Sequence, residues 1–137
     1  MKPSFRAVKG AFLLVFTSSY AALAQSGPCA LPEPGPGRTL FVQNCTVCHG
    51  TQGKGGGVLA KALNLSPPDL TTLAARTKGV FPSAHVLSML REGGGETAEG
   101  DKAMPVWAKI FSHECGEDYG KRAVAEIERY IEAIQQR

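Results

Sequence analysis

The stretch NCTVCHG, residues 44–50, places Cys45 and Cys48 three positions apart, with His49 directly after them. A CxxC pair serves as a redox dithiol, as half of a zinc site or as an attachment point for haem, and the adjacent histidine distinguishes these uses. A thioredoxin-type dithiol expects a βαβ setting, whereas this neighbourhood reads as helix and glycine loop. A structural zinc site needs four converging ligands, and no second CxxC pair stands among the other candidates, Cys29, His85, His113 and Cys115. The motif therefore favours haem.

The spacing of the motif matches the chemistry of covalent haem attachment. Two thiols on one helical turn can each form a thioether to a vinyl group on neighbouring pyrroles, so we predict that Cys45 and Cys48 hold one haem c. The next residue projects over the ring face, so His49 is predicted to bind the iron from the proximal side.

The sixth iron ligand decides what such a haem does, and the candidates are Met89, Met104, His85 and His113. Met104 stands directly before Pro105, which restricts it to extended geometry and suits a thioether held over the open face. Met89 belongs to an apolar helical run and is more typical of core packing. The two histidines lie near helix ends and are expected at the surface. We favour Met104, because His/Met ligation closes the iron to exogenous ligands and leaves electron transfer as its chemistry.

The first 24 residues have the pattern of a secretory signal peptide. Lys2, Arg6 and Lys9 precede an apolar run without any acid, and small residues end that run at 22–24. This order predicts cleavage after Ala24. An uncleaved anchor is the alternative, but polar residues at 17–19 interrupt the run, which is short for a span of about 20 residues.

Cleavage would leave 113 of the 137 residues, enough for one compact domain. It removes three of the 15 basic residues and none of the 12 acidic ones, so the remaining chain has 12 of each. A nucleic-acid binder would keep a basic excess, and that partner class is therefore excluded. No later segment has the apolar length of a membrane span. We expect a periplasmic or otherwise extracytoplasmic protein without stable membrane insertion.

The remaining chain reads as an all-α single domain, residues 37–137, preceded by a Pro- and Gly-rich arm at 25–36. Helical spacing from Arg38 leads into the CxxCH motif, and a glycine loop follows. Expected further helices run to about residue 76 from a cap at Asp69 or Thr71, over 84–91 from a cap at Ser83, and from a cap at Asp118 almost to the end. Residues 93–102 read as a loop, and no stretch alternates for long enough to predict a sheet.

A buried porphyrin would supply core that a domain of this size lacks. The apolar side chains expected around it are Val58, Leu59, Leu63, Leu65, Leu70, Leu87, Leu90 and Trp107.

At this point the chain resembles the class I c-type cytochromes, in particular small bacterial mono-haem members. The resemblance covers GRTLFVQNCTVCHG, PPDL, MPVW and the terminal amphipathic helix. It implies close packing of the first helix on the last through Gly37, Phe41 and Tyr130. It also implies that a proline carbonyl orients the proximal imidazole, and Pro67 and Pro68 both remain candidates.

Cys29 and Cys115 lie outside that family pattern. They are an even remainder once Cys45 and Cys48 are consumed by haem, and an oxidising compartment favours a disulfide between them. Two buried free thiols are the alternative.

The sequence thus predicts an exported electron carrier rather than an enzyme, working with redox protein partners. Lysines near the expected haem edge would steer an acidic partner, although evenly scattered surface lysines are the alternative; they are Lys54, Lys61, Lys102 and Lys109. A second interpretation is a haem c subunit permanently bound to a larger oxidoreductase complex. A peroxidase or gas sensor would need an open iron and hence a Met104 that does not bind it.

Overall fold

The computed structural model of the chain describes residues 27–33, 35–62, 65–96 and 102–136. The predicted signal peptide, residues 1–24, and one predicted haem neighbour, Leu63, lie outside the described residues. The side chain of Lys102 is not described either.

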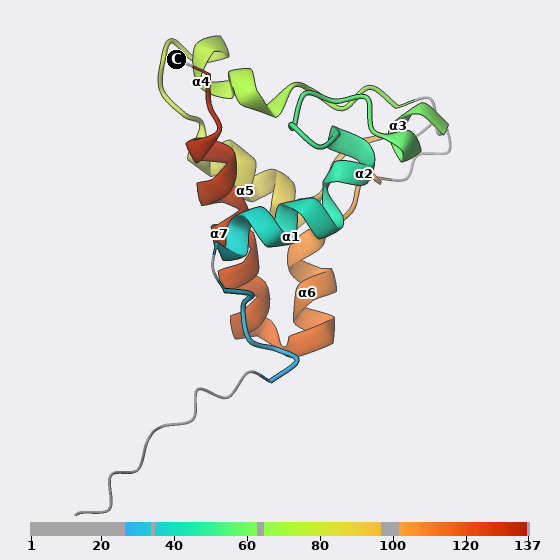
Figure 1. The fold of residues 1–137 in the computed structure, drawn as a ribbon, viewed down its shortest axis with the longest axis vertical. Coiled ribbons are helices and arrows are strands. Elements are labelled where there is room, and N and C mark those ends of the chain that lie inside the picture. The colour runs from blue at the N-terminus through green and yellow to red at the C-terminus, as the bar shows by residue number, and fades with distance from the viewer. Residues whose placement is uncertain (1–26, 34, 63–64, 97–101, 137) are drawn as a thin grey trace, which may run out of the picture.

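Helices dominate the described chain, which confirms the predicted all-α class. Figure 1 shows α7 crossing α1 and running beside α6, with α2 and α3 on the right-hand side of the view. The elements in chain order are α1 (Pro36–Asn44), α2 (Thr46–His49), α3 (Val58–Ala62), the 3-10 turn η1 (Leu70–Thr72), α4 (Leu73–Arg76), α5 (Ser83–Glu92), β1 (Gly94–Glu96), β2 (Lys102–Met104), α6 (Trp107–Cys115) and α7 (Glu117–Ala133).

A short antiparallel hairpin departs from the prediction of a loop at 93–102. Strand β1 pairs with β2, with Gly94 opposite Met104 and Glu96 opposite Lys102. Strands of three residues are too short for the alternating pattern by which strands are recognised in sequence. The hairpin delivers Met104 in the extended conformation that Pro105 predicted.

Helix boundaries differ from the prediction in three places. The helix that leads into the CxxCH motif breaks at Cys45, which separates α1 from α2. Ser83 and Asp118 do not cap: they lie inside helices whose caps are Pro82 and Gly116. Of the alternatives at η1, Asp69 is the cap, because its carboxylate accepts a hydrogen bond from the Thr71 backbone N–H at 2.8 Å.

The crossing of α1 over α7 is close because Gly37 has no side chain. A Cβ on Gly37 would collide with the backbone carbonyl oxygen of Glu126 and touch Tyr130. One helical turn on, the rings of Phe41 and Tyr130 pack with centroids 5.2 Å apart. The three residues that the family resemblance singled out therefore meet at this crossing.

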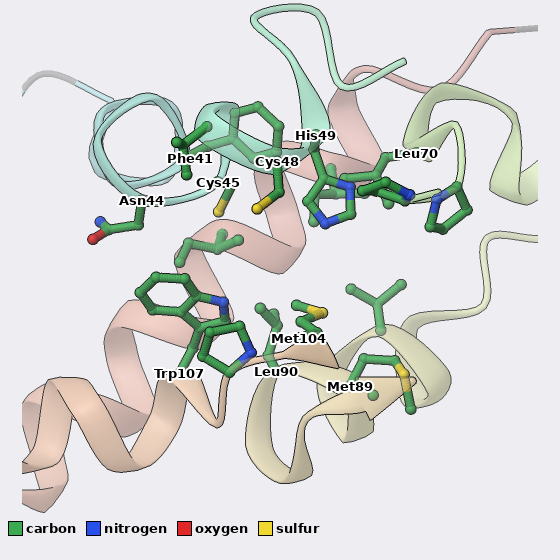
Figure 2. A pocket seen from close by; sticks show the side chains of 18 of the residues that line it. Phe41, Asn44, Cys45, Cys48, His49, Leu70, Met89, Leu90, Met104 and Trp107 are labelled. Atoms are coloured by element: carbon green, nitrogen blue, oxygen red, sulfur yellow. The ribbon is translucent and has the colours of Figure 1, made fainter. Parts of the chain in front are cut away.

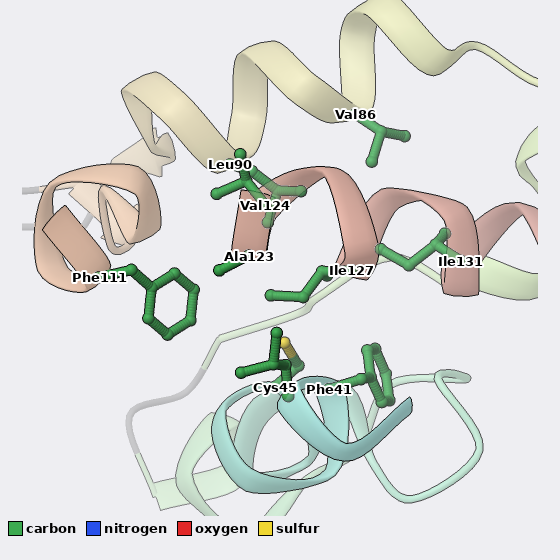
Figure 3. Packing of buried hydrophobic residues seen from close by; sticks show 10 residues of the cluster. Phe41, Cys45, Val86, Leu90, Phe111, Ala123, Val124, Ile127 and Ile131 are labelled. Atoms are coloured by element: carbon green, nitrogen blue, oxygen red, sulfur yellow. The ribbon is translucent and has the colours of Figure 1, made fainter. Parts of the chain in front are cut away.

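The core lies between α7 and the helices around it (Figure 3). The apolar stripe of α7 supplies Ala123, Val124, Ile127 and Ile131, all fully or nearly fully buried. Against this stripe pack Leu40, Phe41 and Cys45 from the first helical segment, Val86 and Leu90 from α5, and Phe111 from α6.

A disulfide joins Cys29 to Cys115, with Cα atoms 5.3 Å apart. It ties the arm that precedes α1 to the C-terminal end of α6, and Leu31 of the same arm packs against the core. The disulfide was the favoured prediction, and the alternative of two buried free thiols is wrong.

Candidate functional site

A cavity of about 570 Å³ opens beside the core and brings the predicted site residues together. Its volume lies within the range of small-molecule and cofactor sites, which is about 300–1,000 Å³. Figure 2 shows the motif side chains on one wall and the hairpin and α6 side chains on the other. The lining is largely apolar, so a group bound here is held mainly by its removal from water.

One wall carries the two motif thiols. Cys45 and Cys48 are free, and both line the cavity. Burial, and to a lesser extent the neighbouring Cys48, raises the pKa of Cys45 from 9.0 to about 12. The unattached Cys45 is therefore a neutral thiol at physiological pH, which matches its place in the apolar core.

His49 lies on the same wall, and its ring points into the cavity (Figure 2). Burial lowers the pKa of His49 below its usual 6.5, and the Pro68 carbonyl opposes only part of that effect. The Nδ1 atom is buried and makes no hydrogen bond of ordinary geometry. The Pro68 carbonyl thus raises the pKa of His49 without accepting a hydrogen bond of ordinary geometry from the ring. Because the effect of burial is larger, the imidazole is neutral, which is the form that binds metals.

The two candidate prolines have different neighbours. The Pro68 carbonyl raises the pKa of His49. The Pro67 carbonyl oxygen instead lies 2.9 Å from the place that a Cβ on Gly55 would take. The glycine loop after the motif folds back on α2 through hydrogen bonds from Gly55 N to His49 O, at 2.8 Å, and from Gly57 N to Cys48 O, at 3.0 Å. This compact loop brings the proline segment to the imidazole.

The opposite wall carries Met104, which faces His49 across the cavity (Figure 2). Trp107, at the start of α6, and Met89, from α5, line the same side. Met104 is partly buried and packs against the core cluster. Of the two histidines expected at the surface, both are exposed, but His85 also lines the cavity, while His113 does not.

Most of the predicted apolar neighbours do line the cavity, namely Leu59, Leu65, Leu70, Leu90 and Trp107. Two of the described ones are not part of the lining, namely Val58, which is 77% exposed, and Leu87, which is partly buried. Sequence reasoning did not place Ile127 and Ile131 of the terminal helix around the haem, yet both line the cavity. It did not single out Leu73 or Val86 as cavity residues at all. Their spacing indicated burial, but burial against protein and against a cofactor have the same pattern.

The mouth of the cavity is marked by residues that both line it and reach solvent. Val47 of α2 and Leu59 of α3 are each 40% exposed and belong to the lining. Lys54 and Lys61, both exposed, stand in the adjoining loop and helix. The cavity therefore has one opening on the side of α2 and α3. His85 of α5 and Pro105, which are also exposed and part of the lining, mark a second exposed part of its rim.

The donor set fits a covalently attached haem. Two free thiols and a neutral imidazole share one wall, a thioether faces the imidazole, and the space between them is apolar. Thiols attach such a ring, and a histidine with a methionine completes the coordination of its iron.

The Cytochrome c family model matches residues 35–134. The chain therefore belongs to the cytochrome c family. Comparisons with curated proteins and with solved structures gave no match.

Family membership sets the general chemistry of the site. Cytochromes c bind haem c covalently and transfer electrons, and their domains typically work outside the cytoplasm. None of the helices in the described ranges combines the length and the apolarity that crossing a membrane requires.

Proposed function

We propose that this protein is an exported carrier of single electrons with one haem c, attached through Cys45 and Cys48 and ligated by His49 and Met104. The observation that carries the proposal is the cavity itself, in which the imidazole and the thioether face each other across an apolar space next to both thiols. A haem bound in this way supplies a one-electron couple.

The residues around this space have separate roles in the proposal. Cys45 and Cys48 fix the ring to α2, and His49 and Met104 bind the iron. Pro68 orients the imidazole and increases its basicity, as acceptors behind a metal-bound histidine do. The apolar lining excludes water and favours the iron state of lower charge, so it supports a raised reduction potential.

Electron exchange is proposed to occur at the α2–α3 side, where Val47 and Leu59 mark the cavity mouth. Residues 35–68 contain no Asp or Glu, and their charged residues are Arg38, Lys54 and Lys61. This basic segment supports docking of a redox protein whose contact surface is acidic.

Export is supported by two features. The first 24 residues follow the order of a signal peptide, and disulfides such as Cys29–Cys115 persist in oxidising compartments. N-terminal sequencing of the protein recovered from its native compartment tests this part, with Gln25 as the expected first residue.

The test of the ligand set is the absorption spectrum of the holoprotein, produced together with haem-maturation machinery. We expect a near-infrared sulfur-to-iron band in the oxidised wild type and its loss in Met104→Ala. Met89→Ala is the matched control, because Met89 lines the same wall, and this variant should keep the band.

Two results would contradict the proposal. A wild type that lacks the band and binds carbon monoxide readily would have an open iron, as a sensor or peroxidase requires. A holoprotein that is recovered from its native source only in a stable complex with a catalytic chain would be an oxidoreductase subunit rather than a free carrier.

A further inference from the structure

Two methionines line the wall opposite His49, and the proposed function, on which this inference rests, gives the iron only one of them. Met104 comes from strand β2 and Met89 from the last turns of α5. Both thioethers are chemically able to bind iron, so the fold must favour one of them by position.

The hairpin places residue 94 beside Met104. Gly94 and Met104 are directly opposite each other in the antiparallel pairing of β1 and β2. Side chains of directly opposed residues lie on the same face of a sheet, with Cβ atoms about 5 Å apart. A side chain at position 94 would therefore lie on the same face of the hairpin as the Met104 side chain.

The place of that missing side chain is taken by Met89. A Cβ on Gly94 would lie 2.5 Å from the Met89 sulfur and 3.5 Å from its terminal methyl carbon. The first distance is shorter than two such atoms can approach without a shift. Gly94 is buried, and α5 leads almost directly into β1 through a hydrogen bond from Gly93 N to Met89 O, at 3.0 Å.

We propose that Gly94 is a positioning residue that selects the iron ligand. Because Gly94 has no side chain, the Met89 thioether packs against the hairpin, to one side of the cavity. Of the two methionines, Met104 is the one that faces His49 (Figure 2). A side chain at position 94 displaces the Met89 sulfur. Because Met89 already lines the cavity, the sulfur then moves into the space opposite His49 and competes with Met104.

The test compares holoproteins with G94A, M89A and G94A/M89A. The readouts are the sulfur-to-iron band and the NMR signal of the bound methionine methyl group, which the haem ring current shifts far upfield in the reduced protein. In G94A we expect a weakened or shifted band and a second upfield methyl signal. M89A alone should resemble the wild type, and G94A/M89A should return to the wild-type pattern, because the competing sulfur is gone.

Each other outcome overturns a distinct claim. A G94A protein with the band and methyl signal of the wild type overturns the role of Gly94. So does a disturbance that persists in G94A/M89A, since the effect would then come from the hairpin alone. If G94A does not accumulate as holoprotein, G94A/M89A decides, and its failure also overturns the role. Absence of both signals from the wild type defeats the His49–Met104 ligation itself.

Discussion

The carbonyl oxygen of Glu126, on α7, occupies the space into which any side chain on Gly37 would project. Helix α1 can therefore cross α7 at this distance only with glycine at position 37. The crossing also aligns Phe41 with Tyr130, and α1 ends next to Cys45. The contact thus fixes α1, the helix that leads into the CxxCH motif, against the core.

We expect Gly37→Ala to destabilise the protein by about 1–3 kcal/mol, the usual cost of overpacking a core. The better helix propensity of alanine, up to about 1 kcal/mol, offsets only part of this cost. Denaturant unfolding of the holoprotein measures the change. Gly27→Ala is the matched control, since a Cβ there would meet nothing within 4 Å. Equal stabilities of the two variants would contradict the close-contact argument.

Replacing both disulfide cysteines should also lower the stability. Cys29 and Cys115 are 86 positions apart in sequence. A cross-link over a loop of this length lowers the conformational entropy of the unfolded chain, which stabilises the folded protein by about 4 kcal/mol. We expect Cys29→Ser/Cys115→Ser to lose most of this in denaturant unfolding while its sulfur-to-iron band stays unchanged. A loss of the band would mean that the disulfide also shapes the cavity.

Asp69 makes the stability depend on acid pH. Hydrogen bonds from the Thr71 hydroxyl and backbone N–H lower the pKa of Asp69 below 3.8, and Lys54 and Arg76 add to this. Because the folded-state pKa is lowered, the stabilisation is present above pH 3.8 and is lost as the pH falls through the folded-state value.

The corresponding measurement follows the free energy of unfolding of wild type and Asp69→Asn from about pH 6 down to about pH 2. The variant cannot lose a proton at this position, and the other acids titrate in both proteins. The wild-type advantage should therefore shrink towards low pH. A difference that stays constant with pH would show that the charge of Asp69 is irrelevant to the turn.

The sequence alone predicted most about those positions at which the chemistry requires particular residue types. The CxxCH motif predicted which side chains meet on one wall, and Pro105 predicted the extended setting of Met104. The choice between Pro67 and Pro68 required coordinates, because neighbouring carbonyls point in different directions. The hairpin could not be predicted either, since its pairing joins segments too short to alternate and one of them begins with glycine.

The sequence predicted that apolar residues are buried, but it did not predict whether each one contacts the protein core or the cavity. Val58 begins a short helix whose buried residue is Ala60, so its side chain reaches solvent. Ile127 belongs to the stripe of α7 that meets both the core and the cavity. The same helical spacing of apolar residues is found whether the stripe faces the core or the cavity. Met89 and Met104 were both visible as candidate ligands in the sequence. The contact between Met89 and position 94, on which the proposed selection rests, could not be predicted from the sequence.

The basic segment around the cavity mouth leads to a kinetic prediction. Lys54→Glu/Lys61→Glu reverses both lysines beside Val47 and Leu59. Oxidation of the reduced variant by a small anionic complex, such as hexacyanoferrate(III), should slow by roughly tenfold at low ionic strength, because the local potential changes sign. Oxidation by a cationic cobalt(III) complex should become faster. Both effects should nearly vanish at about 1 M salt, where charges are screened within about 3 Å.

The matched control carries the same change of net charge at the far end of the molecule. Lys121 and Arg122 are exposed on α7 near its junction with α6, which Figure 1 places away from α2 and α3. Lys121→Glu/Arg122→Glu should change the rates much less than the reversal at the mouth. If the two double variants respond equally, the net charge of the protein governs the rate. Electrons would then not leave preferentially beside Val47 and Leu59.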